Sequence, residues 1–211
     1  MFVRLAKVKD CQEIYDLIKD GDSGMTTLPK SKDEVLERIS WSKKSLNKKA
    51  KRPDKDSYLF VLKENNRIVG ISAIYTSVSK NGTSVFFKQK KKNISSKVFK
   101  FKKSLDVIQL HTVKNPYTEL GTLYLHPDFR GKGRGSLLSL ARFKFMALWP
   151  ERFDQKVVAE IRGKVDKDET SIFWKHFSKY FFDEEMFNNN EISYINNSCL
   201  LYTSPSPRDW D

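Results

Sequence analysis

The sequence predicts an α/β (α+β) fold in which a mixed central sheet is flanked by helices. Segments that alternate apolar and polar residues, as strands do, are interspersed with segments whose apolar residues recur at helical spacing. Between residues 119 and 161, the order strand, glycine-rich turn, helix, strand predicts two neighbouring parallel strands joined by a crossover. With 211 residues and 39% hydrophobic side chains, the chain can bury a core.

The chain is expected to begin with a strand followed by two helices. Residues 2–8 alternate like a strand, and Asp10 with Glu13 has the spacing of a capping box that begins a helix. After a loop, Ser31 with Glu34 forms a second such pair. The apolar positions of these helices are Ile14, Leu17 and Ile18 in the first, and Val35, Leu36 and Ile39 in the second.

A β-hairpin is expected next. The strands cover residues 58–62 and 68–75 around a turn at residues 64–67, and Gly70 marks a β-bulge. The pattern over residues 83–113 alternates only in part, and it does not select one type of element.

The following segment carries the strand, turn, helix and strand that define the fold class. We predict a strand over residues 119–125, a helix over residues 133–149 that Pro150 ends, and a strand over residues 156–161. A further helix is predicted over residues 171–180. Because the chain has no internal repeat and no long linker, these elements are expected to form one domain.

The charge balance favours anionic partners. The 39 basic and 26 acidic side chains give a formal net charge of +13, which attracts nucleic acid, acidic lipid or a polyphosphate ligand, although a lysine-rich coding bias explains it equally well. The sequence has neither a run of about 18 apolar residues nor a secretion signal, so we expect a cytoplasmic protein with no membrane contact. Cys11 and Cys199 alone predict no disulfide and no metal site.

The glycine-rich turn before the predicted helix 133–149 is the clearest sign of a ligand. Its three glycines alternate with basic residues and have no Cβ that would keep a ligand from the backbone. The first N–H groups of a helix lack helical partners and lie at the positive end of its dipole, so they bind phosphate groups. The predicted cofactor-binding residues are Leu125, Arg130, Gly131, Lys132, Gly133, Arg134 and Gly135.

Two common phosphate-binding turns fit less well. A dinucleotide-binding turn has its first glycine almost directly after the strand, whereas residues 126–130 intervene here. A P-loop ends in Gly-Lys-Ser or Gly-Lys-Thr, which this turn lacks.

The turn instead resembles the acyl-CoA pyrophosphate motif R-x-x-G-x-G/A of the GNAT acyltransferase superfamily. Over a wider range, from about residue 1 to residue 198, the chain resembles the arginine N-succinyltransferase family. The stretches that carry this resemblance are SGMTTLP at 23–29, TLYLHPDFR at 122–130, SLARFKFMA at 139–147 and VVAEIRG at 157–163.

This resemblance implies a GNAT-like fold and the transfer of a succinyl group from succinyl-CoA to the α-amino group of L-arginine, a step of arginine catabolism. The implied partners are these two small molecules, with no metal and no nucleic acid. Assembly as a homo-oligomer or with a paralogous subunit is left open. Members of the family continue well beyond the length of this chain, into a second acyltransferase-like half.

Three residues are candidates for the catalytic base. Acyl transfer to an amine requires a neutral nucleophile, an aligned thioester and stabilisation of the oxyanion. Glu119 and Glu160 lie at strand ends that flank the glycine-rich turn, and His126 precedes Pro127. The alternatives are solvated or ion-paired carboxylates and a structural histidine.

Three further residues are candidates for binding the substrates. Arg162 could hold the distal carboxylate of the succinyl group in a bidentate pair, or form an ordinary salt bridge. Thr26 and Thr27 offer hydroxyl groups in the loop where the resemblance places the acceptor, or simply join two helices.

Other readings of the chain remain open. A nucleic-acid-binding module would explain the basic stretch 88–103 with Phe99 and Phe101, but not the glycine-rich turn. A GNAT enzyme with another amine acceptor, such as ornithine, or with another acyl donor fits the motifs almost as well. Residues 199–211 back-translate to a string that resembles a sequencing adapter, so we expect a non-native tail after a domain that spans residues 1–198. This domain is expected to be incomplete, and an inactive fragment is a further alternative.

Overall fold

The computed structural model describes residues 1–19, 28–78, 84–113 and 115–159, and in addition Asp166, Ile172, His176 and Tyr180. These residues fall into two units. The first comprises Met1–Asn81 and Asn115–Arg162, and the second includes Gly82–Lys114. The predicted helix over residues 171–180 lies almost wholly outside the described residues, as does the tail 199–211.

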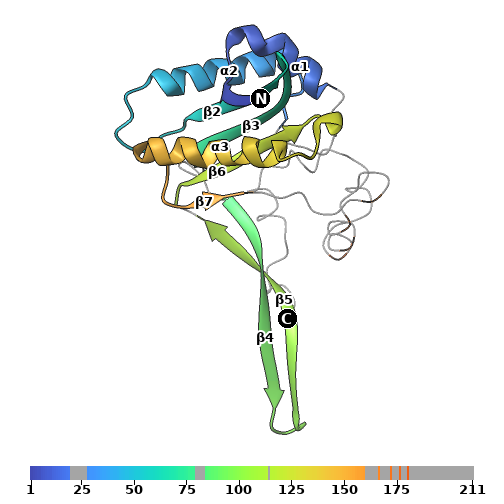
Figure 1. The fold of residues 1–211 in the computed structure, drawn as a ribbon. Coiled ribbons are helices and arrows are strands. Elements are labelled where there is room, and N and C mark those ends of the chain that lie inside the picture. Colours follow the sequence, from blue (N-terminus) through green and yellow to red (C-terminus); the bar gives the residue numbers. More distant parts are fainter. Residues whose placement is uncertain are drawn as a thin grey trace. The chain divides into compact units, whose positions relative to one another are not determined.

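A five-stranded mixed sheet forms the centre of the first unit (Figure 1). Its spatial order is β1, β2, β3, β6, β7, and all neighbours are antiparallel except β6 and β7, which are parallel. The predicted parallel pair with a crossover helix is therefore confirmed. The strands are β1 (Phe2–Leu5), β2 (Ser57–Glu64), β3 (Arg67–Val78), β6 (Tyr117–Leu125) and β7 (Val157–Val158).

Helices cover both faces of this sheet, which confirms the predicted fold class (Figure 1). One face packs against α1 (Cys11–Ile18) and α2 (Lys32–Asn47), and the other against α3 (Arg134–Leu148). The largest apolar cluster lies below α1 and α2, where burying each large aliphatic side chain contributes roughly 1.5–3 kcal/mol. Its fully buried members include Ile14, Val35, Ile39 and Ile71. The described residues of this unit also form three short 3-10 helices: η1 (Val8–Asp10), η2 (Pro127–Phe129) and η3 (Pro150–Arg152).

The β2–β3 hairpin has the turn and the bulge that the sequence predicts. Asn65 and Asn66 have φ values of 47° and 63°, as a two-residue turn of the mirror-image type requires. Leu62 pairs with Gly70 and Lys63 with Ile68, so β3 carries one extra residue at the predicted bulge. A Cβ on Gly70 would lie 2.9 Å from the side chain of Leu125 and 3.0 Å from the backbone oxygen of Tyr124, so this glycine also permits close packing.

The two predicted capping boxes differ from the structure. The Asp10 side chain does not cap α1, and Glu13 instead accepts a hydrogen bond from the Ile68 N–H at 2.6 Å. At α2, Ser31 Oγ accepts from the Glu34 N–H at 3.1 Å as predicted. The Glu34 carboxylate, however, accepts from the Lys30 N–H rather than from that of Ser31. Glu13 is therefore engaged by a partner distant in sequence, whereas Glu34 keeps a local partner that differs from the predicted one.

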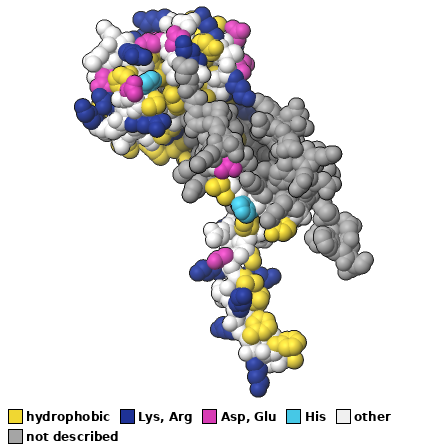
Figure 2. Space-filling view, turned by 90° about the vertical axis from the view of Figure 1, so that its right-hand side faces the viewer, with side chains coloured by type: hydrophobic (Ala, Val, Ile, Leu, Met, Phe, Trp, Pro, Cys, Tyr) yellow, Lys and Arg dark blue, Asp and Glu magenta, His cyan; other side chains and the backbone are white. Residues whose placement is uncertain are grey.

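The described part of the second unit is one long hairpin of β4 (Ser84–Ser96) and β5 (Phe101–Val113), paired in register from Ser84↔Val113 to Ser96↔Phe101. This is the stretch whose structure the sequence pattern left open. Figure 2 shows basic and hydrophobic side chains along it. Across both units, none of the described helices is long and apolar enough to cross a membrane.

Candidate functional site

The glycine-rich turn has the strand-turn-helix context that its sequence predicts. After β6 and η2, the chain passes through Gly131, Lys132 and Gly133 with φ values of 88°, 49° and 74°, and α3 begins at Arg134. Three successive left-handed residues are strained for any side chain with a Cβ, and two of the three are glycines. Gly133 is the N-cap residue of α3, and its carbonyl accepts the Leu137 N–H at 2.9 Å.

The backbone of this turn is open to a ligand. A Cβ built on Gly131, Gly133 or Gly135 would meet nothing within 4 Å, so close packing within the protein does not explain these glycines. The first N–H groups of α3 therefore lie beside open space at the positive end of a 15-residue helix. This arrangement suits a phosphate or diphosphate group.

The three basic residues of the turn differ in their surroundings. Arg130 and Lys132 are exposed beside the open backbone. Arg134 forms a bidentate pair with Glu64 at the end of β2, with N–O distances of 2.6 and 2.8 Å. The hydrogen bond from Arg134 lowers the pKa of Glu64. Arg134 thus fastens the start of α3 to the sheet, and Arg130 and Lys132 are the side chains placed to add charge around a ligand.

The pairing of β6 changes along its length. Among the described residues, β7 pairs only with Thr118 and Glu119. Further along, Ala73 pairs with Gly121 and Ile71 with Tyr124, so β6 places two residues opposite one of β3. Thr122, within this bulge, has a φ of 48°. Leu125 ends the strand, and its side chain packs in the cluster below α3. The sequence did not predict this bulge, because the residue with the positive φ is Thr122 and not a glycine.

A polar cluster lies beside the bulge on the face covered by α1 and α2. The hydroxyl of Tyr75 accepts from Arg38 Nη1 at 2.9 Å and shares a hydrogen bond of 3.1 Å with Thr122 Oγ1. Glu119, a predicted base, is the direct register partner of Tyr75. A Cβ on Gly121 would lie 2.7 Å from the Tyr75 ring, so the glycine lets the ring lie against the strand. Arg38 and Tyr75 come from α2 and β3, and no local motif marks them.

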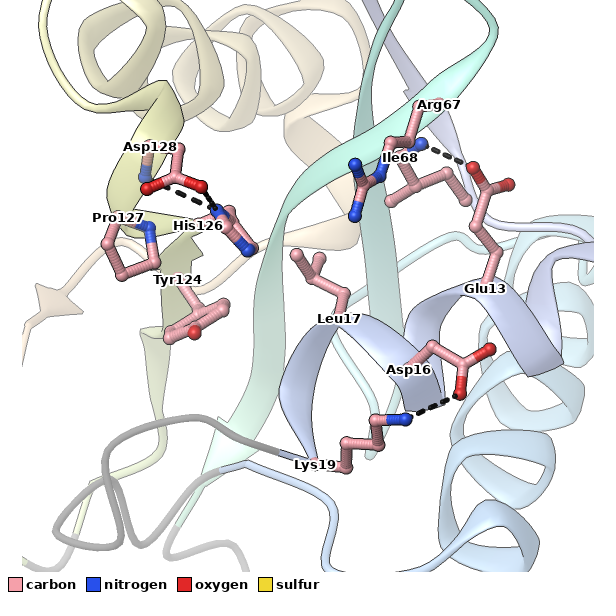
Figure 3. Close-up of a pocket in the computed structure, with 10 residues that line it drawn as sticks. All are labelled: Glu13, Asp16, Leu17, Lys19, Arg67, Ile68, Tyr124, His126, Pro127 and Asp128. Carbon is pink, nitrogen blue, oxygen red and sulfur yellow. Dashed lines mark hydrogen bonds and ion pairs between the residues drawn. The ribbon is translucent and has the colours of Figure 1, made fainter.

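His126 lines a pocket of about 590 Å³ between α1, the start of β3 and the end of β6 (Figure 3). Its Nδ1 accepts from the Asp128 N–H at 3.3 Å. The same nitrogen lies 3.7 Å from the Asp128 carboxylate. His126 thus contacts the start of η2 from the end of β6. The pocket is lined by Glu13, Asp16, Leu17, Lys19, Arg67, Ile68, Tyr124, His126, Pro127 and Asp128.

The other predicted site residues, Thr26, Thr27, Glu160 and Arg162, lie outside the described residues. Within the part of the chain that the structure describes, no three His, Cys, Asp or Glu side chains come together as metal ligands would.

The chain has relatives that share both its sequence and its fold. The family described as arginine N-succinyltransferase beta subunit matches residues 1–201. The chain is similar to arginine N-succinyltransferase subunit beta of Pseudomonas aeruginosa, at 31% identity over 95% of this chain and 59% of that protein. It is also similar to arginine N-succinyltransferase of Yersinia pestis, at 34% identity over 88% of this chain and 53% of that protein.

The fold agrees with a solved structure of arginine/ornithine succinyltransferase subunit AI from Pseudomonas aeruginosa. The TM-score is 0.75 at 27% identity, over 91% of this chain and 57% of that one. The chain thus spans a little over half the length of the relatives it matches. Because the match in sequence covers nearly the whole chain, this protein belongs to the arginine N-succinyltransferase beta subunit family.

Proposed function

We propose that this protein takes part in transferring a succinyl group from succinyl-CoA to the α-amino group of L-arginine. Membership of the family and the names of its relatives support the reaction. The observation that carries the proposal is the left-handed glycine turn, whose open backbone and following helix suit the diphosphate of coenzyme A. Arg130 and Lys132 would add charge to that site.

The stretch of β6 between the bulge and Leu125 is the proposed path for the rest of the thioester. The arm of coenzyme A contains amide groups, and the free N–H and C=O groups of a strand edge bind an extended amide chain as they would another strand. A ligand anchored at the turn and running back along β6 would bring its thioester to the bulge at Thr122.

The reaction needs little from the protein beyond positioning. The amine lone pair forms the new C–N bond, the C–S bond breaks, and the amine proton leaves to a base. An α-amine with a pKa of about 8 costs only about 1 kcal/mol to deprotonate at neutral pH, so a half-buried carboxylate is a sufficient base. Of the predicted bases, Glu119 lies beside the bulge and faces Tyr75, and we assign it this role.

Ornithine is a second candidate acceptor, because one solved relative is named an arginine/ornithine succinyltransferase. Assembly with a paralogous subunit is proposed on similar grounds, since relatives are named as subunits. Thiol release from succinyl-CoA or acetyl-CoA, with arginine or ornithine as acceptor, separates these substrates.

Calorimetry with coenzyme A tests the turn itself. Gly133→Asp adds a negative charge where the diphosphate is expected, and we expect binding to fall at least about 100-fold. Gly133→Asn is the matched control, because it has nearly the same shape without the charge and also tolerates a left-handed backbone. Equal affinity of both variants and the unchanged protein would contradict the assigned site.

A further inference from the structure

Arg142 is a buried cation beside β6. It lies in α3 and is only 4% exposed. Its guanidinium donates to the Ser139 carbonyl at 3.4 Å, to Ser139 Oγ at 3.0 Å and to the Gly121 carbonyl at 3.3 Å. These acceptors are all neutral, and burial lowers the pKa of Arg142.

A buried guanidinium without a counter-charge is costly, because neutral oxygens replace only part of the solvation that the cation loses. Two other arginines of this chain show the usual solution. Arg4 forms a fork with Asp10, and Arg134 forms one with Glu64. For Arg142, no carboxylate of the described residues lies within salt-bridge distance. The hydrogen bonds to Ser139 and Gly121 also engage three of the five N–H groups of Arg142.

The position of Arg142 relates it to the proposed donor site. Its hydrogen bond to Gly121 places the guanidinium at β6 directly before the bulge, beyond the two residues that pair with β7. Along α3 it lies eight residues after Arg134, or about 12 Å from the start of the helix. A thioester bound at the turn and along β6 would therefore bring its acyl end close to Arg142.

We propose that Arg142, oriented by Ser139, receives the distal carboxylate of the acyl group and so selects an acyl donor that ends in a carboxylate. This inference rests on the proposed function and names the residue that sets its donor specificity. The bound carboxylate supplies the counter-charge and accepts the remaining N–H groups in the bidentate geometry that guanidinium favours. Arg162, the candidate for this role predicted from the sequence, lies outside the described residues.

Binding measurements with three ligands test this assignment. Succinyl-CoA, butyryl-CoA and coenzyme A share the nucleotide and arm, and butyryl has the four-carbon chain without the carboxylate. We expect the unchanged protein to bind succinyl-CoA roughly 10- to 100-fold more tightly than butyryl-CoA. In Arg142→Gln this preference falls to about one, whereas affinity for coenzyme A stays within a factor of about two.

Two further variants keep the test decisive. Arg142→Lys retains the charge without the fork and should recover only part of the preference. Ser139→Ala removes one oxygen that orients the guanidinium, and alanine is a good helix former, so this variant should fold. It should reduce the preference for succinyl-CoA over butyryl-CoA several-fold, which tests the assignment even where Arg142→Gln does not fold. Thermal unfolding of each variant shows which of them fold.

The assignment is overturned if the unchanged protein shows no preference, if both Arg142→Gln and Ser139→Ala retain it, or if Arg162→Gln alone removes it. A failure of the unchanged protein to bind coenzyme A would instead overturn the proposed function. Binding of coenzyme A without discrimination between the two acyl groups overturns only the role of Arg142.

Discussion

Asp10 holds the start of the chain together through its carboxylate. It is 2% exposed, and it accepts two hydrogen bonds from Arg4 at 2.6 and 2.8 Å and one from the Lys7 N–H at 2.7 Å. Burial alone would raise the pKa of Asp10, but these hydrogen bonds outweigh it and lower the pKa below its ordinary value. The stabilisation is therefore complete above the ordinary pKa of about 4 and is lost as the pH falls through the lower, folded-state pKa.

Replacing Asp10 with Asn should therefore lower stability in a pH-dependent way. At pH 7 we expect the free energy of unfolding to fall by roughly 1.5–3 kcal/mol, because charge-assisted hydrogen bonds are lost. The difference from the unchanged protein should shrink in urea unfolding below about pH 4. Asp16→Asn is the control, since its pair with Lys19 is exposed and should contribute much less to stability than the buried Asp10 carboxylate. A difference that is constant with pH would contradict this account.

The two ends of α2 are stabilised in different ways, one by a local residue and one by a residue distant in sequence. Ser31 caps its start through a bond to the Glu34 N–H three residues later. At its end, Arg152 donates to the carbonyls of Ser45 at 2.9 Å and Lys48 at 3.0 Å. The start of α2 is therefore encoded locally, whereas a side chain from η3, more than 100 residues later, satisfies carbonyls at its end.

The local cap of α2 can be tested by itself. We expect Ser31→Ala to lower the free energy of unfolding by about 1 kcal/mol, because the Glu34 N–H loses its acceptor. Ser31→Asn should restore most of that loss, since its side-chain oxygen caps equally well. Urea unfolding of the three proteins measures both changes. Equal stability of the Ala and Asn variants would show that the serine does not act as a cap.

The described residues form a first unit with a buried core and, in the second unit, a hairpin with an exposed tip. Val98 and Phe99 at the tip of the β4–β5 hairpin are 84% and 80% exposed. The basic stretch that suggested a nucleic-acid-binding module lies on this hairpin, whereas the glycine turn lies in the first unit. The two competing interpretations of the sequence therefore concern different units of the molecule.

This division predicts that the hairpin tip contributes little to the stability of the core. The double variant Val98→Ser with Phe99→Ser should change the free energy of unfolding by less than about 0.5 kcal/mol and leave binding of coenzyme A unchanged. Ile39→Ala, in the core, should cost about 2–5 kcal/mol. A loss of more than about 1 kcal/mol in the double variant would show that the tip is buried against another part of the protein.

The amino-acid sequence alone determined the features that depend on near neighbours. The Asn65-Asn66 turn, the bulge at Gly70, the start of α3 after Gly133 and the parallel pair β6–β7 all agree with their patterns. The turn, the bulge and the helix start depend on backbone preferences within a few residues, and the parallel pair follows from the order strand, helix, strand along the chain. The resemblance carried by the four stretches at 23–29, 122–130, 139–147 and 157–163 also led to the family to which the chain belongs.

Only the tertiary structure decided which charges meet. Arg134 pairs with Glu64, 70 residues away, and Tyr75 meets Arg38, 37 residues away. Arg142 reaches Gly121 instead of a carboxylate. Sheet register and helix packing bring these groups together, and both depend on contacts between distant segments. For this reason the sequence could point to the turn that suits a diphosphate, but not to the buried arginine beside the strand.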